Sequence, residues 1–258
     1  MAVRGVFALE LSITFFAFAI PAVLFAGVSK GGFGSGAAFA AAPFLALILE
    51  PAAAIGLMLP LLMVMDMTAL RPYWRRWNWP IARRMIIGGL PGVCLGAALY
   101  SVANADVLRF LIGSVAVGFV AYQLARARGL LRLEERKPFA GAGYFWGGAA
   151  GFTSFISHAG GPPAAVYLLT RGLDKTTFQA TTVIVFTAIN LFKAVFYAGL
   201  GIFTRETLWA GLFLVPVAFG GVYLGVWLHR IVPERLFFGI TYVLLTVTGT
   251  KLILDALT

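Results

Sequence analysis

The stretch GVSKGGFGSGAAFAAAP, residues 27–43, has a counterpart 124 residues later in GFTSFISHAGGPPAAVY, residues 151–167. Both stretches are rich in glycine and small polar residues, and both interrupt a chain that is otherwise strongly apolar. Glycine lets a backbone leave the helical conformation and lets a ligand approach it closely. Two such interruptions at matching places in two membrane-embedded halves are typical of a binding site at the bilayer midplane.

The composition requires a lipid environment. Hydrophobic residues make up 60% of the chain, charged residues only 12%, and the mean hydropathy is +0.91, well beyond an ordinary soluble domain. The apolar runs are rich in Leu, Ala and Phe and lack the alternation of a membrane β-barrel. We therefore expect an all-α polytopic membrane protein.

Charges and prolines divide the chain into 8–10 membrane segments of about 20 residues each. The second and seventh are short, so each is either a half-helix or one arm of a re-entrant hairpin. The expected segments are residues 5–28, 33–49, 52–70, 82–101, 105–125, 139–157, 159–170, 176–199, 207–228 and 235–256.

The net charge of +10 is concentrated in two loops beside membrane segments. Clustering of this kind follows the positive-inside rule, so we expect both loops to be cytoplasmic and expect no nucleic-acid partner. Counting outward through ten segments places both termini outside the cytoplasm. The residues of the two loops are Arg71, Arg75, Arg76, Arg83 and Arg84, and Arg126, Arg128, Arg132, Arg136 and Lys137 with Glu134 and Glu135.

The whole chain, residues 1–258, is expected to form one membrane domain with two repeated halves, 1–125 and 139–258, joined by a basic cytoplasmic linker at 126–138. Five crossings in the first half would start the second half from the opposite face and give an inverted repeat. If the first two segments form a re-entrant hairpin instead, the first half crosses three times, which is still an odd number of crossings and still gives an inverted repeat. Four crossings would instead make the halves parallel.

The duplication extends beyond the glycine-rich stretches. Asp66 aligns with Asn190 at the same offset of 124, and Pro91 aligns with Pro216 at an offset of 125. The order of these matches is preserved along the chain, as expected for a repeat with small loop insertions.

Several other classes of site are not indicated. The single cysteine, Cys94, lies in an apolar segment, so it forms no disulfide within the chain and belongs to no thiol cluster for a metal. No Cys/His metal spacing, nucleophile elbow or phosphate-binding loop is found. The apolar amino end contains Glu10 and is interpreted as a first span rather than a secretory signal.

At these residues the chain resembles a known family, the TauE/SafE sulfite exporters, which are anion permeases. The most specific segments are SHAGGPP at 157–163 and NLFK at 190–193, and the similarity covers nearly the whole chain. The resemblance implies a bacterial inner-membrane carrier for sulfite, sulfoacetate or a related small anion, with no bound cofactor. It leaves the substrate, the direction of transport and a homo-oligomeric state open.

The residues of the first stretch are suited to an anion. Glycines free backbone N–H groups there, and a helix restarting after them would direct its positive dipole end at a bound oxyanion. Two alternatives are open: the glycines form a helix-packing seam, and Lys30 extends to the cytoplasmic surface. The candidate ligands are Ser29, Lys30, Gly31, Gly32, Gly34 and Ser35.

The second stretch repeats this chemistry. Pro162 and Pro163 cannot donate backbone hydrogen bonds and favour a helix start at this point. His158 can donate to an anion and can change charge near neutral pH, or else it bonds a carbonyl for packing. The candidate ligands are Thr153, Ser154, Ser157, His158, Gly160 and Gly161.

Three further polar residues lie deep in apolar segments: Asp66, Asn190 and Lys193. Ionisable groups in the bilayer are usually paired or functional. Asn190 and Lys193, at i and i+3, share a helix face and are assigned to the anion, while Asp66 is assigned to proton coupling. The alternative is an ion pair of Asp66 with Lys193 that bridges the two halves. Tyr197 and Gln179 are further candidate hydrogen-bond donors.

Three functional classes remain for a membrane protein with these features. A secondary anion carrier, with the lipid bilayer, a small anion and a coupling proton as its partners, explains the repeat and the buried cations together. A membrane-embedded enzyme would need a nucleophile with its base, or a set of metal ligands. Asp66 and His158 alone do not make up such a set. An anion channel would share the glycine-rich stretches and differs in its kinetics.

Overall fold

The computed structural model describes residues 12–33, 37–130, 139–228 and 231–258. Over these residues the regular structure is entirely helical, which confirms the all-α part of the prediction. The elements are α1 (Ile13–Val28), the π-helix η1 (Ser29–Phe33), the 3₁₀ helix η2 (Ala38–Ala40), α2 (Ala41–Leu45), α3 (Pro51–Leu70), α4 (Trp79–Val102), α5 (Ala105–Ala127), α6 (Ala142–Ser157), α7 (Gly161–Leu169), α8 (Lys175–Gly199), α9 (Arg205–Leu228) and α10 (Glu234–Leu257).

Capping residues explain where the long helices begin. The side chain of Asn78 accepts from the Ile81 N–H before α4, and that of Asn104 accepts from the Val107 N–H before α5. Asp174 does the same for Thr176 and Thr177 at the start of α8. Each side chain satisfies a backbone donor that the first helical turn leaves unpaired.

Seven helices are long and apolar enough to cross a membrane in the part of the chain that the structure describes. The count is below the expected 8–10 because α2, α6 and α7 have 5, 16 and 9 residues. Among its described residues, the second expected segment, 33–49, contains the last residue of η1 and the short helices η2 and α2. At about 1.5 Å per residue, these helices fall short of the ~30 Å hydrocarbon core.

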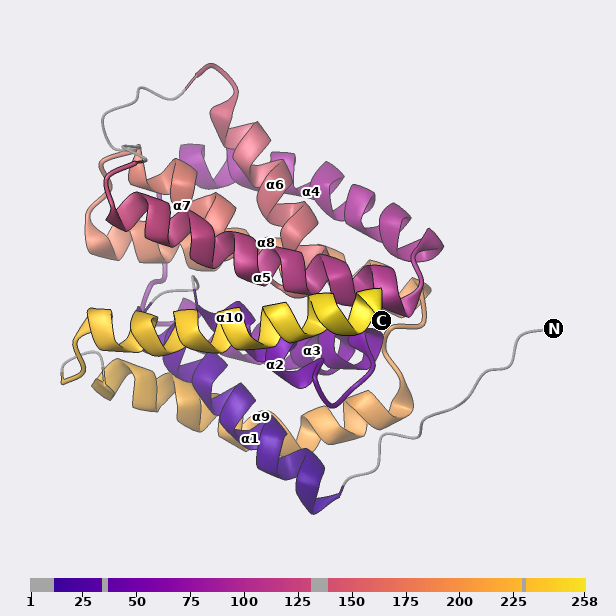
Figure 1. Ribbon diagram of the computed structural model, residues 1–258. Helices are drawn as coiled ribbons and strands as arrows, with labels where there is room; N and C mark the ends of the chain where they lie inside the picture. The colour runs from indigo at the N-terminus through magenta and orange to yellow at the C-terminus, as the bar shows by residue number, and fades with distance from the viewer. Residues whose placement is uncertain (1–11, 34–36, 131–138, 229–230) are drawn as a thin grey trace.

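The long helices pack in pairs that join the two halves of the sequence. In Figure 1, α4 and α6 lie side by side at the top, α5 and α10 cross the middle, and α1 and α9 lie at the bottom. Helix α3 also packs against α8 and α9, and α4 packs against α8. The halves are therefore interleaved, with contacts between them along most helices.

The ends of the helices are distributed between two sides of the molecule. In Figure 1, α5 ends and α10 begins on the left, while α1 begins and the C terminus lies on the right. Helices α5 and α10 therefore run antiparallel. Helix α4 also begins on the left side, so the loops that follow α3 and α5 lie on the same side of the molecule.

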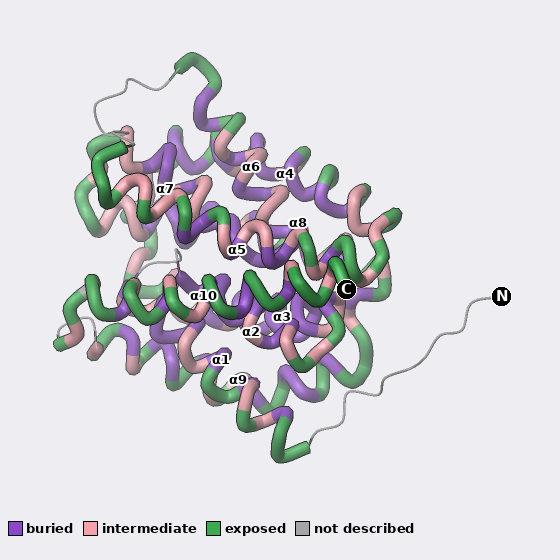
Figure 2. Tube along the Cα trace, viewed as in Figure 1, coloured by how far each residue is buried: buried purple, intermediate pink, exposed green. Residues whose placement is uncertain are grey.

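The outer faces are apolar and exposed. Figure 2 shows exposed residues along the outward sides of α9 and α10, around an inner zone of buried residues. Phe213 and Trp227 on α9 and Val243 on α10 are 58%, 58% and 67% exposed. Soluble monomers rarely expose large contiguous apolar patches, so this surface fits contact with lipid chains.

Candidate functional site

Helix α1 loses its α-helical hydrogen bonding at the first glycine-rich stretch. The π-helix η1 follows directly and contains Ser29 and Lys30, both buried. At Gly31 a Cβ atom would lie only 3.0 Å from the Cα of Val222 on α9, so only glycine fits this close approach. At Gly31, the glycine therefore allows close helix packing, which is one of the two alternatives given for this stretch. Gly32 is partly buried, while Gly34 and Ser35 lie outside the described residues.

The second glycine-rich stretch separates α6 from α7. Helix α6 ends at Ser157, and His158 adopts the left-handed conformation with φ of 58°. Helix α7 begins at Gly161, so Pro162 and Pro163 lie in its first turn as expected. A Cβ at Gly160 would lie 2.7 Å from the Ala150 carbonyl oxygen, which accounts for the glycine there.

Two of the three candidate hydroxyls in this stretch, those of Thr153 and Ser157, are engaged within α6 and its end. The Thr153 hydroxyl contacts the carbonyl oxygens of Ala149 and Ala159, each at 2.9 Å. Ser157 donates to the Thr153 carbonyl at 3.3 Å. In this conformation both hydroxyls stabilise the end of α6.

The central contact of the molecule joins three elements through one carboxylate. Lys30 from η1 forms a buried ion pair with Oδ1 of Asp66 on α3. Nδ2 of Asn190 on α8 donates to the other oxygen, Oδ2, over 2.7 Å. The side chains of Lys30 and Asp66 are 6% and 4% exposed. Lys30 therefore does not extend to the surface, and that alternative is wrong.

A second polar cluster surrounds the fully buried side chain of Lys193 on α8. Its Nζ lies 2.7 Å from the Ser154 carbonyl oxygen and 2.8 Å from Nδ1 of His158. Nε2 of His158 lies 2.9 Å from the Ile55 carbonyl oxygen, which can only accept. Nε2 therefore carries a proton, and Nδ1 is left as the acceptor for the Lys193 ammonium.

The proposed ion pair between Asp66 and Lys193 is not formed, because Asp66 pairs with Lys30 and Lys193 bonds the end of α6. The carbonyl end of a helix carries partial negative charge and suits a cation. Tyr197, one turn further along α8, donates to the Phe155 carbonyl over 2.6 Å. Gln179 donates to the Lys30 carbonyl at 3.4 Å.

A small cavity of about 20 Å³ lies between the two clusters. It is lined by polar side chains of Lys30, Ser154, His158 and Asn190, and by Gly161. About 10–15 Å³ is enough for one water molecule, so this conformation has room for a water rather than for a sulfur oxyanion. Lys193 is not among the residues that line the cavity.

The charges of the two clusters do not cancel. Lys30, Lys193 and Asp66 contribute two positive charges and one negative charge when ionised, all within buried parts of the described chain. A buried excess of positive charge favours the entry of an anion. Over the described residues, no group of three His, Cys, Asp or Glu is arranged to hold a metal ion.

Residues 19–252 match the protein family described as Sulfite exporter TauE/SafE, which covers most of the chain. The chain belongs to this family. TauE/SafE is a membrane transporter family and not an enzyme family, and the seven apolar helices agree with a multi-pass membrane protein. Among curated proteins and among solved structures, none matches the chain.

The cavity of this TauE/SafE protein also has apolar walls that sequence reasoning missed, formed by Ala38, Phe39, Leu62 and Phe186. One signal could have indicated Phe186, because it precedes Asn190 by four residues and shares its helix face. The same signal marks Leu62, which precedes Asp66 by four residues, whereas Phe39 carries none because apolar and small residues surround it in sequence.

Proposed function

We propose that the protein is a secondary transporter of a small sulfur-containing or organic anion, such as sulfite, sulfoacetate or a similar organosulfonate, in the bacterial inner membrane. The observation that carries the proposal is the arrangement around the cavity. Lys30, Asn190, Ser154 and His158 come from both halves of the sequence and converge on one buried space with excess positive charge. Donor groups of this kind suit an oxyanion.

We also propose that the two halves are inverted repeats. The equivalent helices α5 and α10 run antiparallel, which supports inverted rather than parallel repeats. The main helix contacts support a two-fold relation between the halves, because they have counterparts when the halves are exchanged: α4 with α6 corresponds to α9 with α1, and α3 with α9 corresponds to α8 with α4. The contact between Asp66 and Asn190 gives further support. Two residues at equivalent repeat positions meet only where the axis relating the halves passes between them.

Binding of the anion would require the cavity to enlarge. In an alternating-access transporter, two halves move against each other around a fixed site, and this site lies where η1, α6 and α8 meet. The breaks near Lys30 and His158 are then the points at which the short helices would shift. Ser29, Gly31, Gly32, Thr153, Ser157 and Gly160 would shape the backbone around the anion. Gly34 and Ser35, which lie outside the described residues, are further candidate ligands of the anion.

Lys193 takes an indirect role in this proposal. It contacts Nδ1 of His158 and closes the end of α6, so the proton of the histidine stays on Nε2. This N–H would leave the Ile55 carbonyl oxygen to donate to the anion. Asp66 is proposed as the coupling carboxylate, since it competes with any bound anion for Lys30.

The proposal is tested by uptake and counterflow in proteoliposomes with sulfite, sulfoacetate, taurine, sulfate and acetate. We expect saturable uptake and counterflow for one or more sulfur-containing anions. Asn190→Ala should raise the KM strongly. Thr187→Ala, on the same helix with its hydroxyl bonded to Val183, should leave the KM unchanged. Conductance without saturation or counterflow would favour an anion channel, and transport of none of the anions would contradict the proposal.

A further inference from the structure

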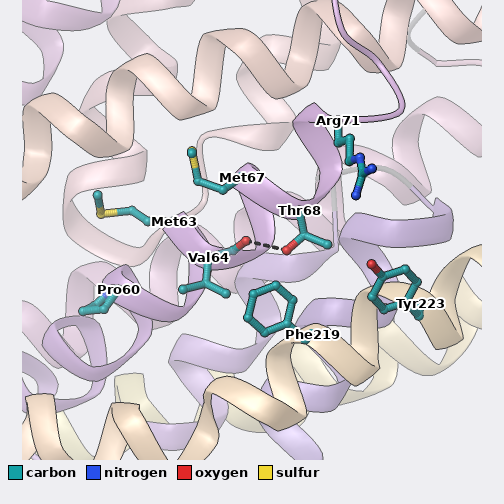
Figure 3. A pocket seen from close by; sticks show the side chains of 8 residues that line it. All are labelled: Pro60, Met63, Val64, Met67, Thr68, Arg71, Phe219 and Tyr223. Atoms are coloured by element: carbon teal, nitrogen blue, oxygen red, sulfur yellow. Dashed lines mark hydrogen bonds between the residues drawn. The ribbon is translucent and has the colours of Figure 1, made fainter.

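A second hollow lies on a different face of α3 from the polar clusters, between α3 and α9. It has a volume of about 540 Å³ and is shown in Figure 3. Its α3 wall runs from Pro60 through Met63 and Met67 to Arg71, at spacings that place these residues along one helix face. Phe219 and Tyr223 of α9 form the opposite wall.

The hollow is open to the outside and apolar over most of its length. Met67 and Tyr223 are 64% and 67% exposed. The hydroxyl of Thr68 donates to the Val64 carbonyl over 2.8 Å, as the dashed line in Figure 3 marks, so it is engaged within α3. A flexible apolar chain fits such walls, and methionine side chains adapt readily to it.

The length of the groove corresponds to one leaflet of a bilayer. Pro60 and Arg71 are eleven positions apart on the chain, or roughly 16 Å at ~1.5 Å per residue. The hydrocarbon core is ~30 Å thick, so the groove covers about half of it. Arg71 directly follows the 20-residue helix α3, so the arginine end would lie at the level of the lipid headgroups, on the side of the basic loop that follows α3.

The charge at this end is available to a ligand. Arg71 forms no ion pair with any residue that the structure describes. A neighbouring hollow of about 440 Å³ shares Met67 and Arg71 and is bordered by Trp74. Tryptophan is enriched at membrane interfaces, and a guanidinium group binds phosphate oxygens in a bidentate manner.

We propose that this groove, defined by Pro60, Met63, Met67, Arg71, Phe219 and Tyr223, is a binding site for one anionic phospholipid. An acyl chain lies along α3 and α9, and the phosphate contacts Arg71 and the Tyr223 hydroxyl. The site goes beyond anion transport and would exist whatever the transported substrate is.

The experiment is native mass spectrometry of the full, delipidated protein with phosphatidylglycerol or phosphatidylcholine of identical acyl chains. One basic contact at a membrane surface corresponds to a preference of about fivefold for the anionic lipid. We expect Arg71→Gln to abolish this preference. Arg76→Gln, an exposed arginine of the same loop that does not line the groove, should keep it. Met67→Trp, which fills the groove, should reduce retention of both lipids.

Folding of each variant is checked by gel filtration and by anion counterflow. Equal retention of the two lipids by the unchanged protein would overturn the proposal, as would equal effects of Arg71→Gln and Arg76→Gln. Lipid retention unchanged by Met67→Trp, together with a loss of dimers, would show that a second copy of the chain covers the groove instead.

Discussion

At the scale of single residues, the Asp66 carboxylate compensates the buried charge of Lys30 and also accepts a hydrogen bond from Asn190. Its two oxygens hold different partners, Lys30 from the first glycine-rich stretch and Asn190 from the second half. Removing one partner from a buried ion pair leaves an uncompensated charge in a medium of low polarity. The effect of a substitution at Lys30 on the free energy of unfolding should therefore depend strongly on the residue at position 66, and the reverse.

We predict that Lys30→Gln lowers the free energy of unfolding by about 3–5 kcal/mol, since Asp66 stays buried without its cation. In an Asp66→Asn background the same change should cost much less, because no buried carboxylate is left unpaired. Thermal unfolding of the two single variants and the double variant in detergent measures this coupling. Additive effects would show that the two side chains do not interact in the folded protein.

Lys193 gives a second prediction at this scale. Lys193→Met removes the donor to the Ser154 carbonyl and to His158 Nδ1, and unsatisfied buried acceptors cost about 1–3 kcal/mol. We expect reduced thermal stability and a raised KM for the anion, because the His158 ring loses its orientation. Lys193→Arg should restore neither the stability nor the KM fully, since a planar guanidinium replaces a compact ammonium.

Tyr197→Phe is the matched control for Lys193→Met. It removes one donor to the same end of α6 and leaves His158 untouched. It should lower stability with little effect on the KM. A normal KM in Lys193→Met would show that this lysine is purely structural.

At the scale of helices, the two halves are held together by close backbone contacts. A Cβ at Gly92 on α4 would lie 2.8 Å from the Gly148 carbonyl carbon of α6. On α9, a Cβ at Gly225 would lie 2.8 Å from the Val28 Cα of α1. Interfaces between membrane helices are enriched in small residues because these let backbones approach closely.

We predict that Gly92→Ala and Gly225→Ala each separate a helix pair and lower both the unfolding temperature and the transport rate. Gly220→Ala is the control, since no atom lies within 4 Å of its added Cβ, and alanine favours a helix over glycine. Thermal unfolding and sulfite counterflow are the measurements. Equal stability of Gly225→Ala and Gly220→Ala would contradict the close contact with α1.

The long helices could be predicted from the sequence because prolines, capping residues and charges mark their ends. Residues 52–70 and 176–199 were expected, and the helices are Pro51–Leu70 and Lys175–Gly199. The segment at 33–49 was overestimated, since an apolar run resembles a span even where the chain forms only short helical turns. Hydropathy measures what a segment can bury and not whether it stays helical.

The polar site could be predicted only in part. Asp66, Asn190 and Lys193 could be predicted because charged and amide groups are rare in apolar segments, and Lys30 because it lies in the first glycine-rich stretch. Their partners could not be inferred, since pairing depends on how α3, α6 and α8 pack. The acceptors of Lys193 and His158 include backbone carbonyls, which every residue has and which leave no trace in the sequence.

At the scale of the whole molecule, the basic loops should face the cytoplasm. Helix α4 has 24 residues and, at about 1.5 Å per residue, is long enough to separate its two ends by the full membrane. In a Cys94→Ala background, we predict that an impermeant thiol reagent labels Ser101→Cys in intact cells. Arg76→Cys and Arg128→Cys should react only after the membrane is permeabilised. Labelling of all three in intact cells would contradict this orientation.

The last prediction concerns energy coupling between protons and the anion. Asp66 neutralises Lys30, so protonation of Asp66 would release the Lys30 ammonium for the anion. A proton and an anion would then bind together and cross together. Asp66→Asn mimics the protonated acid and leaves Lys30 permanently available. We expect this variant to keep anion counterflow and to lose accumulation driven by a pH gradient.

Asp106→Asn is the matched control, because Asp106 is an exposed carboxylate that pairs with Arg109 outside the site. It should keep both counterflow and gradient-driven accumulation. Both are measured in proteoliposomes with a pH gradient as the only driving force. If Asp66→Asn still accumulates the anion under these conditions, Asp66 is not the coupling group. Its contacts with Lys30 and Asn190 then serve to hold η1 and α8 against α3.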